Sequence, residues 1–486
     1  MAYFHGVYNT EQDTSLTVPV QGSAGLQVIF GVAPIHLSAD PAKAANTPKL
    51  CYSFKECQQA VGYCDDFAHF SLCQSIDACF RVFNVAPIIL INVLDPAKEE
   101  HTTKNEAEDC DVVDGTVLYN KEYVLLDSLV VKNSDATLVP GSDYVATHDD
   151  TGNVVITLIS ETAKEAETLN VASTSIKPDG VTAADIVGGV DVATGKETGL
   201  ELVRQIYPKL GMTPGLLLAP EWSHDAVVAA ALQAKTEAIN GVFDCFAYLD
   251  IAADSTGAEV YTEVKTAKEA MGASGTHAAA FWPKVAVGDK VYCMSAMAAA
   301  LTAYNDAENG DVPYESPSNK DLRITATVLA DGTEVMLDQQ QANDMLNANG
   351  IITAINANGF KLWGNNTAAY PSTSDPKDRW LAVRRFFDWD GNNFIRTYFQ
   401  KVDKPGNKRL IQSIVDSQNI VGNGYVARDY CAGYRLEFVS EENPVTNLLN
   451  GHLTTHTYMA PYIPAEFIEN IREYDVAALE ASFGGE

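Results

Sequence analysis

Three consecutive stretches decide the fold class: Gly215-Leu-Leu-Leu-Ala-Pro220, the alanine-rich residues 225–239, and Phe243-Asp-Cys-Phe-Ala-Tyr-Leu-Asp-Ile251. The first and third are short apolar runs typical of buried strands, and the stretch between them has helical composition. A strand, a helix and a strand in this order form a βαβ unit, which implies parallel pairing with a right-handed crossover. Residues 26–33 add another apolar strand, so we predict an α/β core.

A different pattern lies between residues 117 and 159. Short runs rich in Val, Ile, Leu and Tyr alternate there with turn signals such as Pro140-Gly141. This spacing is typical of a small all-β sandwich inserted at the surface. We therefore predict a mixed α/β, α+β multidomain chain, divided into an N-terminal arm 1–22, a core segment 23–95 packing with the C-terminal domain, the inserted β-sandwich 96–195, a middle α/β domain 196–350, a C-terminal core domain 351–465 and a C-terminal arm 466–486.

Composition limits the possible partners. The 33 basic and 64 acidic residues leave a net charge of −31, which disfavours direct nucleic-acid binding because such binding depends on Lys and Arg. No stretch approaches the ~18 apolar residues of a membrane span, so we expect no membrane insertion. The nine cysteines lack the close pairs that grip zinc. We expect buried, reduced thiols, with disulfides formed after release as the alternative.

Two motifs suggest enzymatic chemistry but lack the required spacing. Gly189-Val-Asp-Val-Ala-Thr-Gly-Lys196 resembles a phosphate loop, yet its first glycine is one residue too distant and Glu197 stands where Ser or Thr must bind magnesium. Ser223-His-Asp225 contains the residue types of a hydrolytic triad, but adjacent residues entering a helix project about 100° apart. A helix N-cap explains this tripeptide better. An α/β hydrolase or nucleotide-binding enzyme remains the alternative function.

Two possible metal sites are equally incomplete. Asp388-Trp-Asp-Gly-Asn392 has its glycine at the fourth position of a calcium loop instead of the sixth, and we interpret it as a turn. His452 and His456 would lie ~13 Å apart on a strand, too far to share an ion. We assign no catalytic, cofactor-binding or metal-binding residues and expect no cofactor.

Most of the chain carries, in order, the motifs Phe4-His-Gly-Val7, Ile29-Phe-Gly-Val-Ala-Pro34, Thr194-Gly-Lys-Glu-Thr-Gly-Leu200, Thr213-Pro-Gly-Leu-Leu-Leu-Ala-Pro220, Leu346-Asn-Ala-Asn-Gly-Ile351, Asn358-Gly-Phe360, Trp363-Gly-Asn-Asn-Thr367, Arg379-Trp-Leu-Ala-Val-Arg-Arg385, Glu442-Asn-Pro444, Leu449-Asn-Gly451 and Pro464-Ala-Glu-Phe-Ile468. Together these motifs resemble the contractile tail sheath family of myovirus-type phage tails and related contractile injection particles. Asn366 replaces the arginine that the family carries in the Trp363 motif, so the ion pair of that arginine is not expected here. The likeness is weakest in the insertion, residues 95–195.

The resemblance implies a structural, non-enzymatic subunit that polymerises helically around a tail tube. Its contraction would drive the tube through the target cell envelope, as in viral genome ejection. The implied partners are other copies of the chain, the tail tube protein, and baseplate and tail-terminator proteins. The implied location is the virion tail sheath, assembled in the host cytoplasm.

The resemblance also assigns roles to residues. Sheath subunits lend extended arms to the sheet edges of neighbours, a role carried here to Phe4, Gly6, Val7, Leu16, Val18, Val20, Phe467, Ile468, Ile471 and Tyr474. Residues 467–478 have apolar side chains at helical spacing, but we follow the resemblance and expect residues 467–474 to be extended. The family-motif core comprises Asn347, Gly350, Gly359, Trp363, Gly364 and Thr367.

A basic strip is the one feature of the residues that favours binding. Residues 377–409 contain nine basic and four acidic side chains, an excess of +5 in an acidic chain. Exposed charges usually contribute little, so a solvated face is the plain interpretation. The alternative is a surface that faces the tail tube or the next subunit, with Arg396, Lys401, Lys404, Lys408 and Arg409 as candidates.

Overall fold

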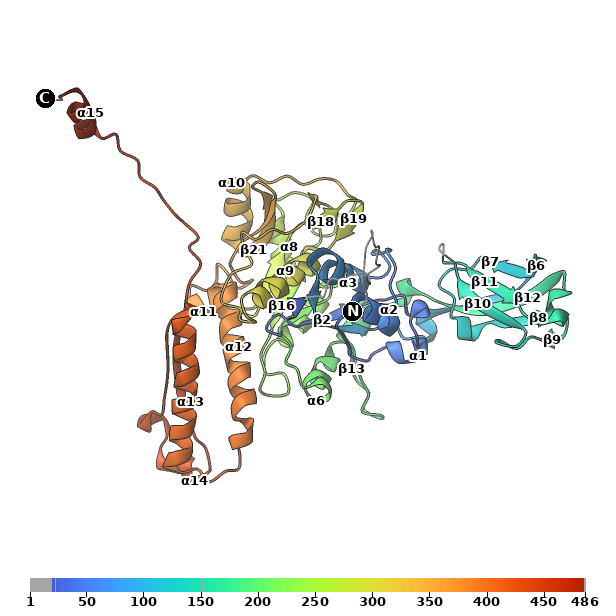
Figure 1. Cartoon of the computed structure of the whole chain (residues 1–486), viewed down its shortest axis with the longest axis horizontal. Helices are drawn as coiled ribbons and strands as arrows, with labels where there is room; N and C mark the ends of the chain where they lie inside the picture. Colours follow the sequence, from blue (N-terminus) through green and yellow to red (C-terminus); the bar gives the residue numbers. More distant parts are fainter. Residues whose placement is uncertain (1–19, 22, 150–151, 485–486) are drawn as a thin grey trace, which may run out of the picture.

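An eight-stranded sheet forms the centre of the molecule (Figure 1). The computed structural model describes residues 20–21, 23–149 and 152–484. The strand order is β22-β21-β17-β16-β15-β2-β5-β3; the strands from β21 to β5 are parallel, and the two edge strands are antiparallel. The bounds are β2 Gln27–Gly31, β3 Lys49–Cys51, β5 Ile88–Asn92, β15 Leu216–Leu218, β16 Phe246–Asp250, β17 Ala278–Phe281, β21 Ile351–Asn356 and β22 Phe360–Trp363.

The predicted βαβ unit is present as β15, α7 and β16, with β15 and β16 paired in parallel. Helix α7, Ala226–Ala234, begins at an Asp225 N-cap, whose carboxylate accepts the backbone N–H groups of Val227 and Val228. The long helix α9, Met294–Glu308, packs on β15 and β16 and is buried on nearly every side. The mixed α/β fold class predicted from the sequence is confirmed. The central sheet joins strands from the segments 23–95, 196–350 and 351–465.

Seven further strands form a β-domain that projects from the body (Figure 1). Their order is β10-β11-β7-β6-β12-β8-β9. These strands enclose a hydrophobic core of their own, which includes Tyr119, Val131, Ile156 and Val171. β6 pairs with β12 along most of its length and with β7 at its last two residues, so the expected sandwich is one folded sheet. The bounds are β6 Thr102–Val113, β7 Thr116–Tyr119, β8 Val130–Asn133, β9 Ala136–Thr137, β10 Tyr144–His148, β11 Val154–Leu158 and β12 Thr168–Ile176.

A helical hairpin and a two-stranded sheet make up the C-terminal region. Helices α12, Leu381–Tyr398, and α13, Lys408–Ala427, run along the side opposite the β-domain (Figure 1). Strands β23, Cys431–Glu437, and β24, His456–Pro461, pair antiparallel. The expected turn at residues 388–392 is wrong, because these residues lie inside α12. Phe386 of that helix is fully buried against α13 and β23, and this packing outweighs the local turn signal.

The remaining elements connect these units. All nine cysteines are free and seven of them are buried. Within the described residues, no helix combines the length and apolarity needed to cross a membrane. The connecting elements are β1 Val20–Gln21, α1 Pro41–Ala44, α2 Phe54–Val61, α3 Leu72–Asp77, β4 Val85–Ala86, α4 Glu161–Lys164, α5 Ala183–Val187, β13 Gly189–Val190, β14 Glu197–Thr198, α6 Ile206–Leu210, α8 Val264–Ala270, β18 Lys284–Val287, β19 Lys290–Tyr292, β20 Ala326–Val328, α10 Gln339–Gln341, α11 Pro376–Arg379, α14 Val445–Leu449 and α15 Val476–Phe483.

Candidate functional site: arms, open strands and a basic tip

After β24 the chain leaves the body at residues 462–465 and continues as the C-terminal arm, which extends away from the body and includes α15 (Figure 1). Residues 467–474 have no helix or strand. Four apolar side chains on this stretch are largely exposed: Phe467 by 82%, Ile468 by 86%, Ile471 by 83% and Tyr474 by 70%. An apolar series of this kind is typical of a segment that is buried against another molecule.

The root of the C-terminal arm is tied to the body through Glu466. Asn365 Nδ2 donates to Glu466 Oε1 at 3.2 Å, and Arg379 lies 3.4 Å from Oε2. Arg379 Nε also donates to Asn366 Oδ1 at 3.0 Å. Asn366 therefore accepts a hydrogen bond from an arginine elsewhere in the chain. A cavity of about 840 Å³ lies between this root and the motif loops, with residues 462–467 forming part of its wall.

The motif loops are joined by hydrogen bonds and close backbone contacts. Asn347 Nδ2 donates to the carbonyl oxygens of Ile351 and Trp363, at 2.9 and 3.0 Å. Gly350 has φ +67°, and a Cβ there would lie 2.7 Å from the Thr367 carbonyl oxygen.

These contacts bring most of the predicted motif core together. Gly364 has φ +137°, and a Cβ there would lie 2.7 Å from Asn347 Nδ2. Gly359 is apart from the others, at the turn between β21 and β22.

Lys268 also holds the motif loops together, and it was not predicted from the sequence. Its Nζ, in a side chain only 6% exposed, donates to the carbonyls of Asn349 and Ala368 at 2.7 Å and of Tyr370 at 3.2 Å. Burial lowers the pKa of Lys268 to about 8. Nothing in the sequence distinguishes this lysine from a surface lysine on an ordinary helix.

The N-terminal arm lies mostly outside the described residues, and so do Phe4, Gly6, Val7, Leu16 and Val18. The backbone at Val20 belongs to β1, which pairs in parallel with β4 of the same chain. The chain is thus bound to its own body at that position.

The β23–β24 sheet is a candidate receiving surface. Within the described chain each of its strands has one partner, so each leaves one edge unpaired. An isolated two-stranded sheet is marginal in water, and its open edges can pair with further strands. One face of β23 packs on α13, where the Tyr434 ring covers Gly422.

The tip of the α12–α13 hairpin gathers the five candidate basic residues, which we call the basic tip: Arg396, Lys401, Lys404, Lys408 and Arg409. Lys401 is half-buried and the other four are exposed. Other arginines of the strip are paired with carboxylates, but in the described part of the chain these five form no ion pair. Phe399 and Val402, at the same tip, are 71% and 63% exposed.

The enzyme-like motifs have structural roles. The residues of the supposed phosphate loop form the β13–β14 hairpin, without the strand-to-helix turn that cradles phosphate. Ser223 Oγ hydrogen-bonds the buried Asp250 carboxylate at 3.3 Å, and Asp225 caps α7. His456 Nδ1 lies 2.7 Å from Glu442. Among the described residues, no group of three His, Cys, Asp or Glu side chains is placed to hold a metal.

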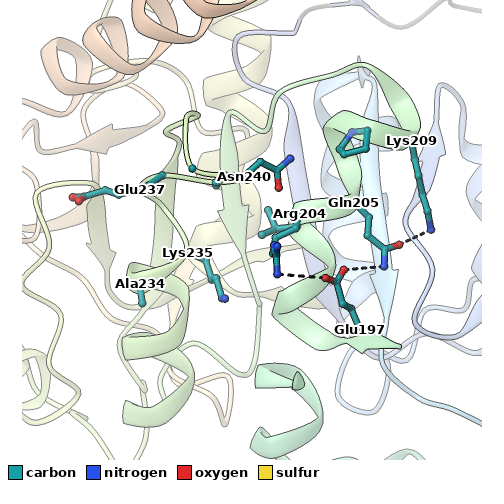
Figure 2. Close-up of a pocket in the computed structure, with 13 residues that line it drawn as sticks. Glu197, Arg204, Gln205, Lys209, Ala234, Lys235, Glu237 and Asn240 are labelled. Atoms are coloured by element: carbon teal, nitrogen blue, oxygen red, sulfur yellow. Dashed lines mark hydrogen bonds and ion pairs between the residues drawn. The ribbon is translucent and has the colours of Figure 1, made fainter. Parts of the chain in front are cut away.

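Figure 2 shows a cavity of about 740 Å³ between α6 and the end of α7. Its cationic side chains are already engaged within the chain. Arg204 lies 3.6 Å from Glu197 (Figure 2). Lys235 lies 2.5 Å from Glu201. Lys209 hydrogen-bonds Gln205. The cavity therefore offers little free positive charge for an anionic ligand.

Comparison with known proteins identifies the family. The tail sheath protein of Burkholderia phage BcepMu is 30% identical over 488 residues, which cover 94% of each chain. The chain belongs to the contractile tail sheath family. The tail sheath protein of Escherichia phage P2 is 27% identical over 302 residues, covering 59% of this chain and 69% of the relative. No family model matches the sequence.

Solved structures share the sheath fold. A chain from the anti-feeding prophage baseplate superposes with a TM-score of 0.58 at 15% identity, covering 98% of this chain and all of that one (100%). A chain from the contracted PVC sheath complex of an extracellular contractile injection system gives 0.57 at 14% identity, covering 98% and 99%. As a sheath protein, the chain is a structural subunit of a contractile particle and not an enzyme.

Proposed function

We propose that this sheath subunit polymerises by adding its two arms to the open edges of β23–β24 in neighbouring subunits. The exposed apolar side chains of the C-terminal arm carry this proposal, since they have no cover within the described chain. Strand addition supplies backbone hydrogen bonds to an extended segment and pockets to its alternate side chains. A head-to-tail contact that does not close produces a helix, which is the form that a sheath requires.

The basic tip provides a second contact in this proposal. Four exposed cations beside exposed Phe399 and Val402 suit an acidic surface with an apolar component. We assign that surface to the tail tube or to an adjacent subunit of this acidic sheath. The triple charge reversal K401E/K404E/K408E then weakens assembly of sheath on tube at moderate salt.

Contraction proceeds in this proposal as rigid-body movement of subunits whose arms stay attached. The extended cylinder is held by a kinetic barrier and the contracted one by larger buried contacts, so no nucleotide is consumed. The movement drives the tube through the target envelope. Baseplate and tail-terminator proteins bind the cylinder's ends, and the sheath is assembled in the host cytoplasm into the virion tail.

The domains have separate tasks in this scheme. In this proposal the inserted domain 96–195 lies on the outside of the cylinder. Its strands β6 to β12 project on the far side of the body from the hairpin (Figure 1). The proposed core segments 23–95, 196–350 and 351–465 form the rigid body that moves. The segments 1–22 and 466–486 act as the arms.

Negative-stain electron microscopy of the purified full-length chain tests the proposal. We expect striated cylinders from the full-length chain. We expect soluble, folded monomers from a chain that lacks residues 1–19 or 462–486. A discrete small oligomer at all concentrations, or normal cylinders from both truncated chains, contradicts the proposal.

A further inference from the structure

Asp311 holds the point where the N-terminal arm joins the body. Its Oδ1 accepts the backbone N–H groups of Ser23 and Ala24, each at 2.6 Å. Its Oδ2 accepts the Ser23 hydroxyl at 2.5 Å. Hydrogen bonds to an ionised acceptor are roughly twice as strong as neutral ones, so one carboxylate fixes two consecutive peptide groups.

The backbone of Asp311 is in a conformation that aspartate adopts at a cost. Its φ is +65°, directly after Gly310 at φ +72°. Glycine adopts a left-handed backbone without steric cost, whereas aspartate adopts it only occasionally. An aspartate here is explained by its carboxylate, which reaches the arm root from this conformation.

The residues next to the arm root are packed against α9. A Cβ on Gly25 would lie 2.6 Å from Ala303 Cα and 3.0 Å from Asp306 Oδ2. Only glycine allows the chain to pass this close to the helix. The chain from Ser23 to Gly25 therefore follows a narrow path along the body, and just before it β1 pairs Val20 and Gln21 with β4.

The same loop reaches the helical hairpin. Val312, 6% exposed, belongs to the core that contains Phe386 of α12 and Tyr425 of α13. Tyr314 stacks on Tyr430 with ring centroids 4.5 Å apart. One short loop thus contacts both the root of the N-terminal arm and the domain that carries β23–β24.

We propose that Asp311 is a positioning residue that, together with the β1–β4 pairing, fixes the direction in which the N-terminal arm leaves the subunit relative to the hairpin domain. The inference rests on the proposed arm exchange. An arm can reach a defined edge in a neighbour only if its exit direction is defined, because a loose root spreads its far end over many directions. Preorganisation of this kind raises affinity without adding a contact to the partner.

Substitution D311G tests the proposal, because glycine removes the carboxylate and tolerates the left-handed backbone. Substitution D114G is the matched control, since Asp114 also has positive φ, at +50°, and lies in the β6–β7 turn away from the arms. Two measurements are made on full-length chains. Hydrogen exchange of the monomer reports protection of the Ser23 and Ala24 amides, and sedimentation gives the critical concentration for cylinder formation.

We expect D311G to lose protection at both amides and to raise the critical concentration at least tenfold, with a melting temperature close to that of the wild type. D311N, which keeps one carbonyl oxygen for the two amides, restores most of the protection and of the polymerisation. S23A, which removes only the hydroxyl contact, has a smaller effect in the same direction.

Failure of the positioning role and failure of the proposed function give different results. Unchanged amide protection in D311G, or unchanged polymerisation despite lost protection, overturns the positioning role alone. A wild-type chain that forms no cylinders overturns the proposed function, and the inference with it.

Discussion

Phe467→Ser and Ile471→Ser test whether the C-terminal arm is buried in the assembled sheath. Both side chains lie on the extended segment, 82% and 83% exposed, so nearly all of their apolar surface remains available for a partner. They are four positions apart and share one face of an extended strand. In the isolated subunit they contribute almost nothing, so the melting temperature stays within about 1 °C of the wild-type value.

The expected change in critical concentration follows from the burial of these two side chains on assembly. Full burial of a Phe or Ile side chain is worth about 1.5–3 kcal/mol. A loss of about 2 kcal/mol per subunit contact corresponds to a roughly 30-fold higher critical concentration for polymerisation. The double variant loses more than either single variant, because both side chains occupy the same face.

Sedimentation of cylinders over a range of protein concentrations measures this quantity. Val192→Ser is the matched control, since Val192 is 98% exposed on the β13–β14 hairpin and belongs to neither arm. We expect this control to polymerise like the wild type. If Phe467→Ser and Ile471→Ser do so as well, these side chains are not buried on assembly and the proposed arm contact is wrong.

Three further predictions concern the hairpin domain. Gly422→Ala places a Cβ 2.0 Å from Tyr434 Cδ1 and is expected to destabilise the chain by about 1–3 kcal/mol in thermal unfolding. Gly424→Ala is the control: its Cβ would have only a 3.5 Å contact, and we expect it to be neutral or stabilising. Burial raises the pKa of Asp390 to about 6, so between about pH 4 and 6 the folded state keeps a proton on this carboxyl that the unfolded state has lost. The free energy of unfolding therefore falls as the pH rises through this range. Asp390→Asn should raise the melting temperature at pH 7.5 but not at pH 4. The triple charge reversal at the basic tip should weaken tube binding at moderate salt in a co-sedimentation assay, and a binding curve that matches the wild type at every salt concentration excludes the tip as a contact with the tube.

The core was predictable because burial on both faces leaves uninterrupted apolar runs in the sequence. The run at 215–220 became β15, and Asp225 capped α7 as its residue type suggests. The end of that helix was misplaced. Helix α7 ends at Ala234, and the chain turns at Ala238 and Asn240, both with positive φ; Asn240 before Gly241 is a turn signal, but Ala238 gives none. The continuity of the β-domain sheet was also missed, because the pairing of β6 with two partners depends on contacts distant in sequence.

The sequence predicted only those parts of the candidate site whose residues lie close together along the chain. The basic tip is continuous in sequence and meets in space because a helical hairpin brings its two ends together. Lys268 and Asp311 could not be found in this way. Their partners lie 81–102 and 287–288 residues away, and a charged side chain carries no sign of the carbonyl or amide that it will meet.

The path of the C-terminal arm in an assembled cylinder tests the central claim most directly. Cryo-electron microscopy at a resolution that traces the main chain should show residues 462–484 of one subunit crossing to another and hydrogen-bonding to an open edge of its β23–β24 sheet. Cylinders in which every C-terminal arm folds back on its own subunit, with the β23–β24 edges unpaired, would contradict it.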